Sequence, residues 1–186
     1  MRVRTFLAQV ANSMKFAAVA IALAATLGVV PRFDGAFAEE PAKAASSDTL
    51  WTASFKDITG AAQKFDGLKG KVSVVYFWAT WCEPCQKEVP QFRALYEKYH
   101  DKGVEVVGIA VDNADKVKEF VVKNQLPFTV VYGGREAMQL SKDLGNSLGG
   151  IPFLAVIGKD GKVVESITGE TADGRIEGIV APLVAG

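Results

Sequence analysis

The chain has few of the residues that bind metals or form crosslinks. Its 186 residues include two cysteines and one histidine. A zinc site ordinarily uses three or four protein ligands, and His100 lies fifteen residues beyond the second cysteine. Two cysteines form at most one bridge, which excludes a framework of several disulfides. We therefore expect no metal site and no cofactor, and chemistry that depends on a single cysteine pair.

The sequence also lacks an excess of charge of either sign. Its 21 basic side chains balance 21 acidic ones. Proteins that bind nucleic acids usually carry a basic surface, so we expect no nucleic-acid partner. Long hydrophobic runs are missing as well. The uncharged run at residues 16–30 is shorter than the ~20 residues of a membrane-spanning helix.

The first 38 residues have the pattern of a secretory signal peptide. Basic residues precede the apolar run, and Ala36-Phe37-Ala38 matches an A-x-A cleavage site. We predict cleavage after Ala38 and a soluble periplasmic or extracytoplasmic protein; an uncleaved N-terminal membrane anchor is the alternative. Translation from Met14 instead of Met1 would give an equally complete signal. Without residues 1–38 the chain has 17 basic and 20 acidic residues, a net charge near −3.

The rest of the chain predicts a tether and one domain. Residues 39–49, rich in alanine, serine and charge, predict a flexible tether. Residues 50–186 suffice for one domain with its own core. Strands alternating with helices, then a hairpin and a helix, predict an α/β fold with a mixed sheet. The expected strands are 50–55, 62–65, 72–77, 104–111, 128–132, 153–157 and 162–168, and the expected helices are 86–99, 114–124, 137–144 and 173–183.

Both cysteines lie where the strand 72–77 meets the helix 86–99. At a helix start, the sulfur of Cys82 is near the positive end of the helix dipole, which favours its thiolate. Cys85 lies one turn further on, close enough to attack Cys82. This arrangement favours thiol–disulfide exchange through a mixed disulfide. A static disulfide is one alternative, although so short a loop restricts the unfolded chain little; a partial zinc site is the other.

The segment Phe77-Trp78-Ala79-Thr80-Trp81-Cys82-x-Pro84-Cys85 resembles the active site of the thioredoxin superfamily. Glu83-Pro84, the downstream Glu88-Val89-Pro90 and the order of elements resemble its TlpA/ResA-like branch of extracytoplasmic thiol–disulfide oxidoreductases. The resemblance implies a thioredoxin-like sandwich with an N-terminal β-hairpin and a central helix–strand insertion. It also implies that Gly150-Ile151-Pro152 forms a cis-proline loop facing the cysteines. Trp81, Ile151 and Pro152 would then bind an extended substrate segment.

Residues beside the pair indicate the direction of electron flow. The carboxylate of Glu83 disfavours a thiolate at Cys82, and Pro84 offers that thiolate no N–H group. Because a less stabilised thiolate makes a couple more reducing, we predict that both residues tune the pair toward reduction of its substrates.

The proton acceptor for Cys85 is less well defined. Tyr76 occupies the position at which thioredoxin carries a buried aspartate that helps deprotonate the inner cysteine. Glu83 and Asp112 are therefore the candidate acceptors, with Asp112 as a possible proton relay. We expect Glu88 to be a solvated residue of the first helical turn, not a catalyst.

These observations predict an exported reductase in which Cys82 attacks a substrate disulfide and Cys85 resolves the mixed disulfide. By resemblance, its substrates are proteins with disulfides or cysteine pairs, such as apocytochrome c or copper-site assembly proteins. A membrane thiol donor would supply the electrons. One alternative is a thiol oxidant or isomerase. Another is a non-enzymatic Cu(I) metallochaperone or assembly factor, since thiolates suit Cu(I); Met138 is the only methionine after residue 38.

Overall fold

The computed structural model describes residues 45–185. The predicted signal peptide, the alternative start at Met14 and residues 39–44 of the predicted tether lie outside the described residues. The helices and strands are, in chain order, α2 (Asp48–Thr52), β1 (Ser54–Asp57), β2 (Ala62–Lys64), β3 (Val72–Trp78), α3 (Glu83–Tyr99), β4 (Val104–Ala110), α4 (Ala114–Asn124), β5 (Thr129–Tyr132), α5 (Arg135–Asp143), β6 (Phe153–Ile157), β7 (Val163–Thr168) and α6 (Arg175–Ala185).

The strands form one mixed sheet in the order β2-β1-β5-β4-β3-β6-β7. Strands β3, β4 and β5 are parallel to one another, and β6 pairs with β3 in the antiparallel sense. The predicted N-terminal hairpin is present as β1 and β2, and β1 joins the sheet through β5. Helix α4 and strand β5 form the predicted insertion between the active-site helix and the last hairpin. The mixed α/β sandwich expected from the sequence is therefore confirmed.

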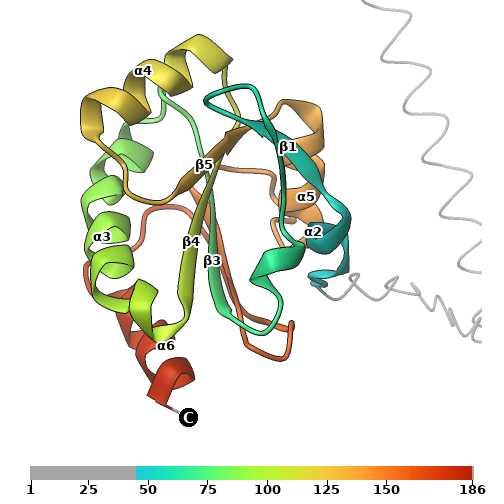
Figure 1. Ribbon diagram of the computed structural model, residues 1–186, viewed down its shortest axis with the longest axis vertical. Coiled ribbons are helices and arrows are strands. Elements are labelled where there is room, and N and C mark those ends of the chain that lie inside the picture. Colours follow the sequence, from blue (N-terminus) through green and yellow to red (C-terminus); the bar gives the residue numbers. More distant parts are fainter. Residues whose placement is uncertain (1–44, 186) are drawn as a thin grey trace, which may run out of the picture. The chain divides into compact units, whose positions relative to one another are not determined.

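Helices cover both faces of the sheet (Figure 1). Along β3, successive side chains point to opposite faces. Tyr76 and Trp78 belong to a buried cluster with residues of α3, α4 and α6. Val75 and Phe77 belong to a second cluster with residues of α2 and α5. Strand β3 is buried along its whole length, which explains why its sequence is a continuous apolar run and not an alternating one.

The predicted strand at residues 50–55 is wrong, because its first half is helical. Helix α2 ends at Thr52, and β1 begins only at Ser54. The predicted tether also ends too late: the Ser46 N–H donates to the Asp143 carbonyl at 3.0 Å. A five-residue helix is too short to show a helical period, so the alternation in its sequence predicts a strand instead. The folded part of the chain therefore begins before residue 50.

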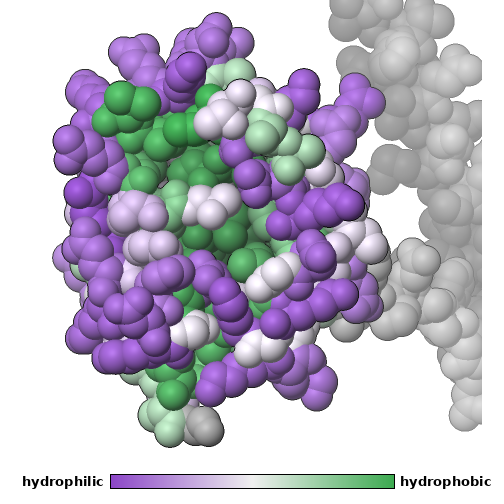
Figure 2. All heavy atoms as spheres, in the orientation of Figure 1, coloured by the Kyte–Doolittle hydropathy of each residue, from purple (hydrophilic) through white to green (hydrophobic). Residues whose placement is uncertain are grey.

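Hydrophilic side chains cover most of the face seen in Figure 2, and hydrophobic ones gather beside α4. Val122 of α4 is among the exposed large hydrophobic residues, together with Trp81, Leu148 and Val164. Among residues 45–185, no helix has the length and apolar character needed to cross a membrane. Trp81 is of particular interest because it immediately precedes Cys82.

Candidate active site

Strand β3 and helix α3 place the cysteine pair at one end of the sheet. Cys82 is the N-cap of α3 and forms a disulfide with Cys85, and their Cα atoms are 5.2 Å apart. The Cys85 backbone N–H donates a hydrogen bond to Cys82 Sγ at 3.3 Å. Cys82 is 6% exposed, whereas Cys85 is fully buried. Cys82 is therefore the sulfur that an incoming thiol or disulfide reaches first.

The loop that carries Pro152 lies at the same end of the sheet. Phe77, near the end of β3, pairs with Phe153, at the start of β6. Two segments are therefore neighbours: the one that follows β3 and leads to Cys82, and the one that precedes β6 and contains Pro152. The Ile151–Pro152 peptide bond is cis. Ile151 is half-buried and packs against the cluster that contains both cysteines.

Trp81 lies beside the more accessible sulfur with 66% of its surface exposed. Because its ring is exposed next to Cys82, a molecule that approaches this sulfur can contact it. The structure thus brings Trp81, Ile151 and Pro152 to the cysteine end of the sheet. Their role in binding substrate stays a prediction.

Glu83 and Pro84 occupy the first turn of α3, which begins three residues before the helix expected at 86–99. The carboxylate of Glu83 forms an exposed ion pair with Lys87, with Oε1 and Nζ 2.9 Å apart. This partner raises the pKa of Lys87 through its hydrogen bond and its charge. The same ion pair offsets part of the negative charge that Glu83 presents to Cys82. The charge of Glu83 therefore destabilises the Cys82 thiolate less than the sequence alone predicts.

Asp112 follows β4 and holds the loop that precedes the cysteines. Its Oδ2 accepts hydrogen bonds from the Thr80 backbone N–H at 2.9 Å and from Thr80 Oγ1 at 2.5 Å. Its Oδ1 accepts from the Asn113 N–H at 2.7 Å. Burial acts to raise the pKa of Asp112, but these hydrogen bonds outweigh it and lower the pKa. Asp112 thus orders the approach to Cys82, and its role as a proton relay stays a prediction.

Glu88 is buried, contrary to the expectation that it would be solvated. It is only 2% exposed. Its Oε2 accepts a hydrogen bond from the Tyr76 hydroxyl at 2.8 Å, and its Oε1 accepts one from the Thr171 backbone N–H at 2.6 Å. Burial raises the pKa of the Glu88 carboxyl above its ordinary value of 4.5, although both hydrogen bonds act in the opposite direction.

Glu88 also lies close to the inner cysteine. Residues three apart on a helix share a face, with Cβ atoms about 5–6 Å apart, so Glu88 lies on the Cys85 side of α3. The Tyr76 hydroxyl, which donates to Glu88, is also 3.1 Å from the Cys85 carbonyl oxygen. Glu88 is therefore a further candidate proton acceptor for Cys85. Its spacing from the buried Cys85, Phe92 and Leu95 was the sequence signal that could have revealed it.

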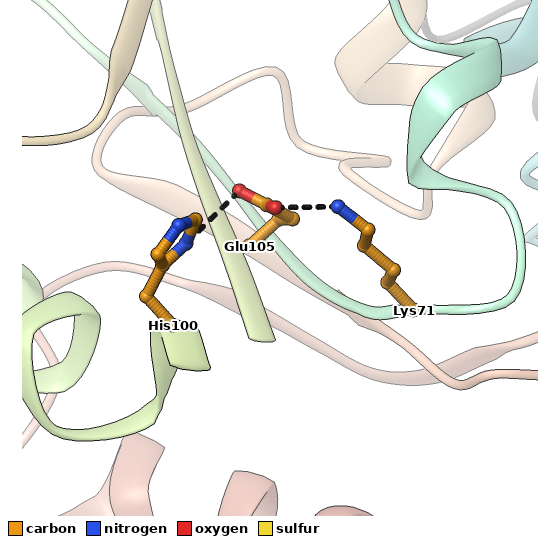
Figure 3. Close-up of polar contacts among 3 residues, drawn as sticks. All are labelled: Lys71, His100 and Glu105. Atoms are coloured by element: carbon orange, nitrogen blue, oxygen red, sulfur yellow. Dashed lines mark hydrogen bonds and ion pairs between the residues drawn. The ribbon is translucent and has the colours of Figure 1, made fainter. Parts of the chain in front are cut away.

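His100 lies at the opposite end of the sheet. It follows α3 and contacts Glu105 of β4, which is also paired with Lys71 just before β3 (Figure 3). The strands β3 and β4 are parallel and begin here, whereas the cysteines follow the other end of β3. Within residues 45–185, no group of three His, Cys, Asp or Glu side chains is placed to hold a metal ion.

Comparison with known proteins places this site in context. A family model described as Redoxin matches residues 41–180. The thiol-disulfide oxidoreductase ResA of Bacillus anthracis is 40% identical over 124 residues, which are 66% of this chain and 69% of that protein. A thiol:disulfide interchange protein of the thioredoxin family from Chlorobium tepidum TLS has a solved structure that is 28% identical. Its TM-score is 0.65, with 71% of this chain and 92% of that chain covered.

A second solved structure, of MTB dsbF in its mixed oxidized and reduced forms, is 26% identical with a TM-score of 0.61. The alignment covers 72% of this chain and 96% of that one. Together the similarities confirm the thioredoxin-like fold and the predicted relation to the TlpA/ResA-like branch. They also confirm that the Cys82–Cys85 pair belongs to a thiol–disulfide oxidoreductase.

Proposed function

We propose that this chain, which belongs to the Redoxin family and is a thiol–disulfide oxidoreductase, reduces disulfides in other exported proteins. The observation that carries this direction is the buried carboxyl of Glu88 one turn beyond Cys85. The nearest cation in the first turns of α3, Lys87, is paired with Glu83 at the surface. With Lys87 paired to Glu83 and the acidic side chain of Glu88 one turn away, the cysteine pair gains little thiolate stabilisation, and such a pair is reducing.

The reaction uses the difference in exposure between the two sulfurs. The Cys82 thiolate attacks one sulfur of the substrate disulfide and forms a mixed disulfide, and the other substrate sulfur leaves as a thiolate that takes up a proton. Cys85 then loses its proton to Glu88 and attacks Cys82 Sγ. The bond between Cys82 and the substrate breaks, and the second substrate sulfur leaves as a thiolate that takes up a proton, which balances the proton that Cys85 gave to Glu88. The substrate gains two electrons and two protons, while Cys82 and Cys85 become the disulfide seen in the structure.

Export and the identity of the partners extend this proposal. The signal pattern of residues 1–38 supports a periplasmic or extracytoplasmic location, where protein disulfides persist. There the substrates would be proteins such as apocytochrome c or copper-site assembly proteins. A dithiol donor at the membrane would return the pair to its reduced form. Sequencing the N-terminus of the secreted protein tests export, with Glu39 expected as the first residue.

The reduction potential of the Cys82–Cys85 couple tests the direction. We expect a value near or below about −270 mV, the potential of thioredoxin, from equilibration with glutathione or dithiothreitol. A value toward about −120 mV, that of the strong oxidant DsbA, would instead identify a disulfide donor. Each ~30 mV corresponds to about 1.4 kcal/mol, so these outcomes are far apart.

Two single variants test the order of the cysteines. Cys82→Ser removes the accessible sulfur, so we expect it to abolish turnover of a disulfide substrate. Cys85→Ser removes the resolving sulfur, so we expect mixed disulfides with substrate to accumulate and to be visible on non-reducing gels. Turnover by Cys82→Ser, or trapping through Cys85 in that variant, would reverse the assignment.

A further inference from the structure

A buried polar cluster lies directly beneath the cysteine pair. It consists of Tyr76 from β3, Glu88 from α3 and Thr171 from the segment between β7 and α6, and all three are buried. The Tyr76 hydroxyl is 2.8 Å from Glu88 Oε2 and 3.1 Å from the carbonyl oxygen of Cys85. A tyrosine hydroxyl has only one proton to donate. Two acceptors therefore compete for it.

The charge of Glu88 decides this competition. An ionised carboxylate is a stronger acceptor than a backbone carbonyl, so the hydroxyl donates to Glu88 when that residue is ionised. A protonated carboxyl has its own O–H and can donate to the Tyr76 oxygen instead. The Tyr76 proton is then free to donate to the Cys85 carbonyl. Protonation of Glu88 is thereby coupled to the backbone of the resolving cysteine.

We propose that Tyr76 is a positioning residue for the resolving step, which holds ionised Glu88 beside Cys85 and donates to the Cys85 carbonyl once Glu88 is protonated. The proton taken up by Glu88 is the one that leaves Cys85 Sγ as it attacks Cys82. No covalent bond to Tyr76 forms or breaks. Its phenol stays protonated, because burial and the adjacent Glu88 raise the pKa of Tyr76 far above its usual range.

The groups that face Glu88 come from three parts of the fold. Tyr76 approaches from β3 and the cysteine pair from the first turn of α3. From the segment before α6, the Thr171 N–H donates a hydrogen bond, and the negative charge of Glu170 acts to raise the pKa of Glu88. If the Tyr76 hydroxyl is removed, the donors that remain come from Thr171: its backbone N–H, and its hydroxyl, which also acts to lower the pKa of Glu88. Ionisation of Glu88 should then require a higher pH.

The variant Tyr76→Phe tests this role. It keeps the ring, whose centroid is 4.0 Å from that of Phe92, and removes only the hydroxyl. The reduced protein is mixed with an aromatic disulfide in a stopped-flow instrument. Attack by Cys82 releases one coloured thiolate, and resolution by Cys85 releases a second. Because a hydrogen bond to a charged group is lost, we expect the pH midpoint of the second phase to rise by about 1–2 units.

Two comparisons separate positioning from a general effect on the fold. Tyr99→Phe removes a similar hydroxyl, which donates to Glu177 Oε1 at 2.9 Å, fourteen residues beyond Cys85 on α3. It should leave both phases unchanged. In Glu88→Gln the pH midpoint of the second phase should disappear. Adding Tyr76→Phe to that variant should not change the pH dependence of the second phase further. The proposal is overturned if Tyr76→Phe leaves the second midpoint in place, or if Tyr99→Phe moves it equally.

A measurement on the unaltered protein keeps the proposal testable should Tyr76→Phe fail to fold. In the oxidised state the cysteines do not titrate, so carbon NMR can follow the Glu88 carboxyl and the Cys85 carbonyl as pH changes. We expect both resonances to share one midpoint, and a Cys85 carbonyl that does not follow Glu88 would refute the coupling. The inference rests on the proposed role of Glu88 as proton acceptor, and it does not depend on whether the cysteine pair reduces or oxidises its substrates. A potential near that of DsbA would therefore refute the reductase alone.

Discussion

Two glutamates of this protein show how surroundings decide the behaviour of one chemical group. Glu88 is buried, and burial raises its pKa despite two hydrogen bonds. Glu177 of α6 is solvent-accessible and accepts hydrogen bonds from Lys98 Nζ at 2.5 Å and the Tyr99 hydroxyl at 2.9 Å. These bonds lower the pKa of Glu177. The same residue type thus has a raised pKa where it is buried near the cysteines and a lowered pKa where it is paired at the surface.

This contrast predicts opposite effects of pH on stability. A carboxyl with a raised folded-state pKa gives stability at low pH that is lost as pH rises through that pKa. Glu88→Gln has no carboxyl to titrate at this position and does not lose this stability. The free energy of unfolding of the variant minus that of the parent protein should therefore increase from pH 3 to pH 8. A lowered pKa gives stability above the unfolded-state value that is lost in acid. Glu177→Gln should therefore lose stability relative to the parent over the same interval.

Denaturant unfolding of the oxidised proteins at both pH values measures these differences. All other titrating groups are common to parent and variant, so they largely cancel. If Glu88→Gln showed the same stability difference at pH 3 and pH 8, the pKa of Glu88 would not be raised in the folded protein.

At the scale of helices and strands, the sequence predicted the long elements better than the short ones. Strand β3 and helix α3 have apolar patterns long enough to identify, and the C-x-x-C motif at their junction located the site. Helix α2 is too short for its period to be seen, so the pattern of residues 50–55 predicts a strand. The sequence predicts a solvated Glu88 because acidic residues in a first helical turn are usually exposed. Its burial depends on Tyr76 and Thr171, which meet it only in the folded protein.

The loop between α5 and β6 offers a test at this scale. Asn146 is fully buried, and its Nδ2 donates to the Gly150 carbonyl at 2.8 Å, just before the cis Ile151–Pro152 bond. Asn146→Ala leaves that carbonyl without this donor, so we expect a loss of about 1–3 kcal/mol of stability. We also expect a lower kcat/KM with a protein disulfide substrate, because the loop that carries Pro152 loses its support.

Asn124→Ala is the matched control. Its amide also donates to a backbone carbonyl, that of Phe120 at 2.8 Å, but at the end of α4. It should lower stability without changing kcat/KM. Equal losses of activity in both variants would mean that Asn146 does not act through the Pro152 loop.

At the scale of the whole molecule, the chemistry belongs to one side of the sheet. Both cysteines and Tyr76 belong to the cluster beneath α3, α4 and α6. The cluster beneath α2 and α5 contains none of these groups. Its contribution is to hold the opposite face of β3 and β6, the two strands from which the site loops extend. Stability and reactivity should therefore be separable by substitution on the α2 side.

Leu50→Ala in α2 tests this separation. Leu50 is fully buried in the second cluster, and removing a buried leucine side chain typically costs about 2–5 kcal/mol. We expect a loss of this size in denaturant unfolding, with the reduction potential and both phases of disulfide exchange unchanged. Thr52→Ala, at an exposed position of the same helix, should change stability by no more than about 0.5 kcal/mol. A small loss for Leu50→Ala would show that α2 is not docked, and an altered potential would show that the two faces are coupled through β3.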